Sequence, residues 1–157
     1  MSVPLVALRA GVTPSTIYRR WGDLPTLLAE VAIERMRPGD VPPDSGNLRT
    51  DLLAWSERFL DRMISDGGLG MIRDVLSSRA GERGIGAAAP SQCAEFATSQ
   101  IEVILSRGRA RGEPTPGVEE VLDAVVAPIL YRALYGRAPP TRAHVRRMVD
   151  TCVAGTR

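Results

Sequence analysis

Side chains suited to binding an anion are concentrated in one short stretch near the start of the chain. The stretch consists of small or polar residues followed by a tyrosine and two arginines: Thr13, Pro14, Ser15, Thr16, Tyr18, Arg19 and Arg20. Residues 1–22 contain three arginines and no acid, whereas the whole chain has a formal net charge of only +2. Hydroxyls, guanidinium groups and the free N–H groups of a helix start all donate hydrogen bonds to phosphate. We therefore expect this end of the chain to bind an anionic partner.

Chemistry of other kinds finds little support in the sequence. The chain has one histidine, His144, and two cysteines, Cys93 and Cys152, which lie outside any CxxC or Cys/His spacing. It has no G-x-S-x-G, no H-E-x-x-H and no glycine-rich phosphate loop. We expect no metal, no cofactor and no enzymatic activity, and interpret both thiols as small core residues. A helical enzyme remains an alternative, because isolated acids such as Asp61 and Asp123 can meet in space.

The composition is that of an ordinary globular protein. Hydrophobic residues make up 44% of the 157 residues and charged residues 24%, so one or two small domains are expected. No apolar run approaches the roughly 20 residues that a membrane-spanning helix requires. The first eight residues lack the basic and apolar regions of a signal peptide. We expect a cytoplasmic protein without a membrane partner.

Apolar residues recur at helical spacing along nearly the whole chain, and no stretch alternates as a strand would. This pattern predicts an all-α fold. The first three helices are predicted at 3–10, from 14 to about 21, and from 24 to about 36. Later helices are predicted at about 47–64, 69–76, 90–110, 118–135 and from 140 onward.

The first two predicted helices have the spacing of a helix-turn-helix. Gly11 ends the first helix, and Thr13 with Pro14 starts the second, because the threonine hydroxyl can accept an unpaired N–H and proline fits the first helical turn. A three-residue turn lies between them. The second helix is short enough to present its first turn to base edges and its last turn to phosphates. We assign base contacts to Pro14, Ser15 and Thr16, and phosphate contacts to Thr13, Tyr18, Arg19 and Arg20.

The order Ala10-Gly-Val-Thr-x-x-Thr-Ile-Tyr-Arg-Arg-Trp21 closely resembles the tetracycline-repressor (TetR/AcrR) family of bacterial transcriptional regulators. The resemblance is specific over the first 37 residues, and beyond them only the pattern of helices is similar. Trp21 stands where the family more often has phenylalanine, and Leu24 where it usually has a lysine that meets a phosphate. The family also places another helix before Val3, for which this chain has no residues. We therefore expect an incomplete three-helix DNA-binding head with one phosphate contact fewer.

The run of prolines and glycines at residues 38–46 is too rich in helix breakers to be helical. It divides the chain into a DNA-binding domain at 1–37, a linker at 38–46, and a helical domain at 47–157. The resemblance implies that this last domain binds an effector and dimerises, with its last two helices contributing to a four-helix bundle.

The candidate effector pocket combines apolar walls with one polar group, as ligand sites commonly do. Its predicted residues are Trp55, Phe59, Met63, Met71, Phe96 and Gln100. The predicted dimer interface consists of Val118, Leu122, Val125, Ile129, Val145, Met148, Val149 and Cys152. The sequence thus favours a homodimeric repressor that binds a palindromic double-stranded DNA operator and is released by an unknown small apolar effector. The alternative is a helical dimer that does not bind DNA and instead binds a small molecule or a partner protein.

Overall fold

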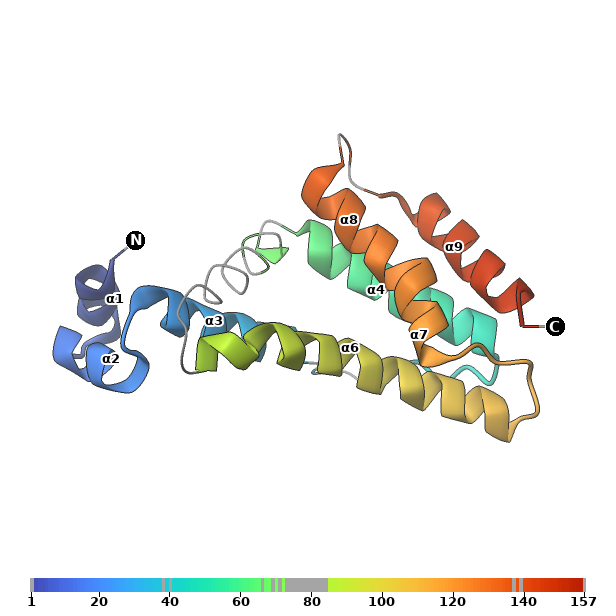
Figure 1. The fold of residues 1–157 in the computed structure, drawn as a ribbon, viewed down its shortest axis with the longest axis horizontal. Coiled ribbons are helices and arrows are strands. Elements are labelled where there is room, and N and C mark those ends of the chain that lie inside the picture. The colour runs from blue at the N-terminus through green and yellow to red at the C-terminus, as the bar shows by residue number, and fades with distance from the viewer. Residues whose placement is uncertain are drawn as a thin grey trace. The chain divides into compact units, whose positions relative to one another are not determined.

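The computed structural model describes residues 2–37, 39, 41–65, 67–68, 70, 72, 85–136, 138 and 140–156, with backbone only at 36, 85–91 and 93. Figure 1 shows that this part of the chain is helical, and it contains no strand. The helices are α1 (Val3–Ala10), α2 (Pro14–Trp21), α3 (Leu24–Met36), α4 (Leu48–Ile64), α6 (Ile85–Ala110), α7 (Val118–Val121), the π-helical turn η1 (Leu122–Val126), α8 (Ala127–Tyr135) and α9 (Arg142–Ala154). The predicted all-α fold is confirmed. The helix predicted at 69–76 lies almost entirely outside the described residues.

Close contacts divide the chain into two compact units. The first unit comprises residues 1–37 and 70–94, and the second comprises 38–69 and 95–157. Residues 85–94 of α6 therefore belong to the first unit and the remainder of this helix to the second.

The first unit has a small apolar core in which α1, α2 and α3 meet. The buried side chains are Val3, Ala7, Ile17 and Leu27, with Val6, Trp21 and Leu24 partly buried around them. Leu24, the leucine that stands where the resembling family usually has a lysine, packs against this core. This side chain helps to cover the core instead of reaching toward a phosphate.

The second unit is a helical bundle in which α4 packs against α8 and α9. Its largest fully buried side chains are Leu48, Leu52, Leu60, Met63, Ile101, Ile104, Leu105, Val121, Val125, Ile129, Val145 and Val149. Ion pairs tie α9 to α4 at the surface: Arg49 donates to Asp150 at 2.7 Å and Arg142 donates to Asp61 at 2.7 Å. The apolar stripe of α4 is therefore covered by helices from the far end of the chain.

The helix predicted at 118–135 is interrupted by a wider turn. At η1 the N–H of Ala127 donates to the carbonyl of Leu122, five residues back. Pro128 follows directly, and a proline ring clashes with the carbonyl four residues before it. Widening the preceding turn relieves this clash without ending the helix. The predicted continuous helix is therefore wrong in this one turn.

Two helix starts also differ from the prediction. α6 begins at Ile85 instead of near residue 90, because the alanines at 87–89 have the highest helix propensity. α9 begins at Arg142, since the Thr141 side chain accepts from the N–H of His144 and the His144 ring accepts from the N–H of Thr141. The His144 side chain is half-buried.

Candidate nucleic-acid interface

The turn between α1 and α2 is held by a glycine in the left-handed conformation. Gly11 has φ 68° and ψ 27°, a conformation that an L side chain adopts only with strain. Its N–H donates to the carbonyl of Leu8 at 3.3 Å, and the N–H of Val12 donates to that of Ala7 at 3.0 Å. These bonds close α1 and turn the chain directly into α2. The predicted helix-turn-helix geometry is present.

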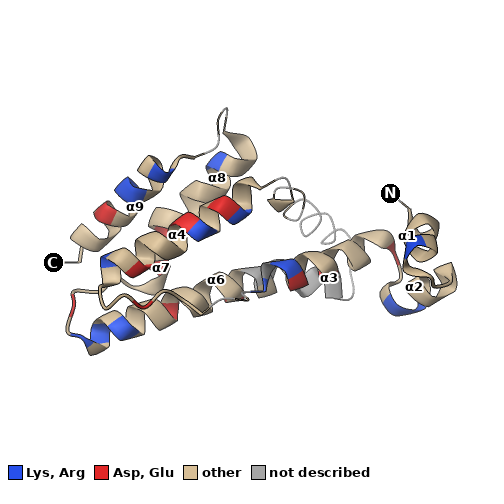
Figure 2. Cartoon of the chain, turned by 180° about the vertical axis from the view of Figure 1, so that it is seen from behind, with Lys and Arg blue, Asp and Glu red and all other residues tan. Residues whose placement is uncertain are grey.

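One side of α2 is anchored in the core and the other faces solvent. Ile17 is 3% exposed and fixes the helix on α1 and α3. The predicted DNA-binding residues are all exposed except Thr16, which is half-buried. Figure 2 shows that α1 and α2 carry basic but no acidic residues. This face therefore combines a hydroxyl-rich first turn with a cationic last turn.

The hydroxyls at the start of α2 form one cluster. Thr13 Oγ1 lies 2.8 Å from Ser15 Oγ and 3.0 Å from Thr16 Oγ1. The predicted cap from the Thr13 hydroxyl to a main-chain N–H is wrong, since the N–H of Thr16 donates to the Thr13 carbonyl instead. Neighbouring hydroxyls compete with the backbone for such bonds. The result is a set of adjacent donors and acceptors at the helix start, suited to polar base edges.

The last turn of α2 is bonded to α3. Trp21 Nε1 donates to Glu30 Oε2 at 2.8 Å, and Arg20 Nη2 donates to Glu30 Oε1 at 3.1 Å. Asp23 caps α3 by accepting from the N–H of Thr26 at 2.8 Å, and this bond lowers the pKa of the Asp23 carboxyl.

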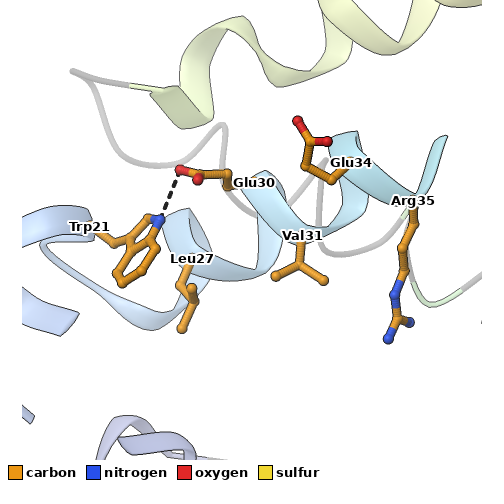
Figure 3. A pocket seen from close by; sticks show the side chains of 6 residues that line it. All are labelled: Trp21, Leu27, Glu30, Val31, Glu34 and Arg35. Atoms are coloured by element: carbon orange, nitrogen blue, oxygen red, sulfur yellow. Dashed lines mark hydrogen bonds between the residues drawn. The ribbon is translucent and has the colours of Figure 1, made fainter. Parts of the chain in front are cut away.

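A pocket of about 310 Å³ lies beside this contact. Figure 3 shows the side chains that line it. It is lined by Trp21, Leu27, Glu30, Val31, Glu34 and Arg35. These residues come from the end of α2 and from α3, on the side of the unit that also holds the Trp21–Glu30 bond. The pocket was not among the sites expected from the sequence.

The residues predicted for the effector pocket are partly brought together in the second unit. Trp55 and Phe59 stack with ring centroids 5.3 Å apart, and Trp55 Nε1 donates to Gln100 Oε1 at 2.8 Å. Met63 is fully buried on the same helix, and Phe96 is half-buried on α6. Met71 lies outside the described residues. The indole N–H of Trp55 is thus satisfied by the side-chain oxygen of Gln100.

The residues predicted for the dimer interface differ in burial. Val125, Ile129, Val145 and Val149 are buried within the single chain. The remaining four are half-buried: Val118, Leu122, Met148 and Cys152. Burial, followed by the nearby charge of Glu120, raises the pKa of the Cys152 thiol.

Two tyrosines on α8 are the large apolar side chains that this helix exposes. Tyr131 is 67% exposed and Tyr135 is 74% exposed, and their ring centroids lie 5.5 Å apart. Neither tyrosine is among the residues predicted for the dimer interface. Their spacing of four residues, which places two aromatic rings on one helix face, is the signal that identifies them.

A cluster of charged side chains holds the segment before α4 against the end of α6. Arg107 donates to the carbonyls of Pro42 and Pro43, at 3.2 and 3.3 Å. Its Nε also lies 3.5 Å from Asp44, and Arg111 lies 3.7 Å from the other oxygen of that carboxylate. Residues 42–44 are therefore held at the end of α6 by two arginines four residues apart.

Asp51 is the buried member of this cluster. Its Oδ1 accepts from the N–H of Ser45 at 2.7 Å, while Oδ2 lies 3.8 Å from Arg111 and has no hydrogen-bond partner among the described residues. Glu113 accepts from the N–H of Leu48 at 2.9 Å and from Arg111 at 2.6 Å. These contacts lower the pKa of the Glu113 carboxyl, so it stays ionised at lower pH than a free glutamate.

The described part of the chain has no group of three or more His, Cys, Asp or Glu side chains arranged to hold a metal ion. None of its helices is long and apolar enough to cross a membrane.

Comparisons with known proteins agree with this architecture. Residues 42–152 match the family described as tetracyclin repressor-like, C-terminal domain. The fold and the head define a helix-turn-helix type of transcriptional regulator. The chain belongs to the tetracycline-repressor (TetR) family.

Similar proteins are named as regulators as well. HTH-type transcriptional regulators of Mycobacterium bovis and Mycobacterium tuberculosis are 29% identical over 155 residues, covering 98% of this chain and 76% of theirs. The HTH-type transcriptional regulator AqdR of Rhodococcus erythropolis is 31% identical over 113 residues, covering 69% of this chain and 51% of its own. A crystal structure described as a TetR-family transcriptional regulator, from Mesorhizobium loti, has the same fold: the TM-score is 0.72 at 16% identity, over 99% of this chain and 84% of that one.

Proposed function

We propose that this protein is a ligand-responsive repressor that binds a palindromic operator as a homodimer. The observation that carries the proposal is the solvent-facing side of α2, with three clustered hydroxyls in its first turn and two arginines in its last. A helix with a small polar first turn can enter the major groove, and one such helix per protomer reads one half-site.

The contacts divide by chemistry. Pro14, Ser15 and Thr16 are proposed to meet base edges, because they lie at the start of α2. Phosphate contacts are proposed for Thr13, Tyr18, Arg19 and Arg20. Such contacts fix the register of the protein on DNA, whereas the base contacts select the sequence.

We infer that release from DNA is driven by a small apolar effector bound in the second unit. The stacked rings of Trp55 and Phe59, with Gln100 beside them, support this assignment. An effector changes DNA affinity only if it binds the DNA-competent and released states unequally.

DNA binding is tested first on the wild-type chain. A fluorescent duplex taken from the DNA flanking its own gene should bind with an affinity that falls steeply as NaCl increases. Unlabelled duplex of the same sequence should compete better than a scrambled duplex of equal composition. The measurement is fluorescence anisotropy. If the duplex does not bind at low salt, the repressor assignment is overturned in favour of a helical dimer that binds no DNA.

Dimerisation is proposed to use the exposed positions of α8 together with the half-buried residues of the predicted interface: Val118, Leu122, Met148 and Cys152. The fully buried valines and Ile129 already pack inside one protomer, so they can add little contact area for a second. The exposed side chains of Tyr131 and Tyr135 can contribute contact area to a second protomer. Aromatic side chains often dominate such interfaces.

Replacing both α8 tyrosines with alanine should weaken the homodimer. Loss of about 2 kcal/mol of binding free energy corresponds to a dimer dissociation constant raised roughly thirtyfold. Sedimentation velocity over a concentration series measures this constant. Tyr18→Ala is the matched control, because Tyr18 is the third tyrosine of the chain and lies exposed on α2. An unchanged constant in the Tyr131/Tyr135 variant would place the interface elsewhere.

A further inference from the structure

Glu30, on α3, forms hydrogen bonds with two side chains of α2. One carboxylate oxygen accepts from the Trp21 indole at 2.8 Å, and the other accepts from Arg20 at 3.1 Å. The Glu30 side chain is 28% exposed, whereas that of Arg20 is 65% exposed. The carboxylate is thus partly enclosed, and the guanidinium it holds stays open to solvent.

The two side chains that bond to Glu30 also contact each other. The Arg20 guanidinium carbon lies 4.6 Å from the centroid of the Trp21 ring, over its face. A guanidinium held between an aromatic face and a carboxylate loses much of its rotational freedom. Arg20 is therefore already oriented before any partner arrives.

The orientation of α2 depends on such contacts. The helix has only eight residues, and its one fully buried side chain is Ile17. A helix this short is not stable alone, so tertiary contacts set its direction. Ile17 anchors the middle of α2, while the bonds to Glu30 fix its last turn on α3 (Figure 3).

We propose that Glu30 is a positioning residue for DNA binding: it fixes the last turn of α2 on α3 and holds Arg20 ready for a phosphate. The inference rests on the proposed function. A positioning role predicts that removing the Glu30 carboxylate weakens DNA binding, whereas charge repulsion alone predicts that it tightens binding. A carboxylate beside a DNA-facing helix repels phosphate, so its removal should tighten binding unless its positioning role matters more.

The test compares Glu30→Ala with Glu34→Ala. Glu34 lies one turn further along α3, is 60% exposed and pairs with Arg37, so its removal changes the net charge equally without touching α2. Figure 3 shows the Glu34 side chain apart from the Trp21–Glu30 bond. Measured by anisotropy on the duplex flanking its own gene, E30A should bind about tenfold more weakly than wild type, and E34A no more weakly.

A conservative pair of variants guards against a general loss of folding. E30Q keeps an oxygen that can accept from Trp21, so it should bind about threefold more tightly than E30A. E34Q is its control. If E30A does not fold, as judged by circular dichroism, the comparison of E30Q with E34Q decides, with about threefold weaker binding expected for E30Q.

A measurement without DNA reports on the contact itself. Trp21 and Trp55 are the two tryptophans of the chain, so Trp55→Phe leaves Trp21 as the sole indole emitter. In that background E30A should shift the Trp21 emission to longer wavelength, and E34A should not.

The outcomes separate the two proposals. Failure of the wild-type chain to bind DNA overturns both. If wild type binds and E30A binds as E34A does, or E30Q as E34Q does where E30A is unfolded, the positioning role is wrong and the proposed function stands.

Discussion

Replacing Arg19 and Arg20 together with alanine should weaken DNA binding at least tenfold and flatten its salt dependence. Each neutralised phosphate contributes about 0.9 to the slope of log affinity against log salt, so losing two contacts lowers the slope by up to roughly 1.8. Both side chains are exposed at the end of α2. The Arg20–Glu30 ion pair reduces the share of Arg20, because the guanidinium is already partly neutralised.

The measurement is anisotropy on the same duplex over a series of NaCl concentrations. The matched control replaces Arg146 and Arg147, an adjacent pair of exposed arginines on α9, and removes the same charge from the second unit. That control should keep the wild-type slope. Equal slopes for the two double variants would show that α2 does not bear the phosphate contacts.

Asp51→Ala should lower the free energy of unfolding by about 3 kcal/mol, since it removes one partner from a buried charged contact. The Asp51 side chain is fully buried and accepts from the N–H of Ser45 at 2.7 Å. Without the carboxylate, Ser45 loses its acceptor, and Arg111 loses one of the anionic groups around it. The change also leaves a small cavity at the start of α4.

Urea denaturation followed by circular dichroism gives this free energy. Asp44→Ala is the control, because Asp44 belongs to the same cluster but its side chain is 53% exposed, and exposed pairs contribute at most about 1 kcal/mol. Asp51→Asn keeps an acceptor for Ser45 and should cost less than alanine. If alanine at 51 costs no more than alanine at 44, the buried carboxylate does not stabilise the fold.

Signals within a few residues were sufficient to predict much of the fold. Gly11 requires a left-handed turn, Asp23 caps the next helix, and Pro14 fits only a first turn, so the first three helices appear where they were expected. The wide turn at η1 escaped prediction because the apolar spacing continues through it. The proline at 128 is itself a local signal, but it is compatible with either a helix end or a widened turn.

Contacts between distant segments were not predictable in the same way. Leu48 and Glu113 are 65 residues apart, and nothing near either indicates the other. The charged cluster has one local indication in the sequence, which is Asp51: it is an acid on the apolar stripe between Leu48 and Trp55. The sequence gives no local indication of the Glu30 contacts, because the two partners on α2 become neighbours of Glu30 only when α3 folds back onto that helix.

The bonds from Arg107 to residues 42 and 43 bear on how this chain can diverge in evolution. The guanidinium binds main-chain carbonyls, which every amino acid supplies. Substitutions at 42 and 43 that keep the local backbone path therefore preserve the contact. A change of Arg107 to lysine instead removes the guanidinium, whose Nη1 reaches both carbonyls while its Nε lies 3.5 Å from Asp44. We expect relatives to vary at the two prolines while retaining arginine at the position of Arg107.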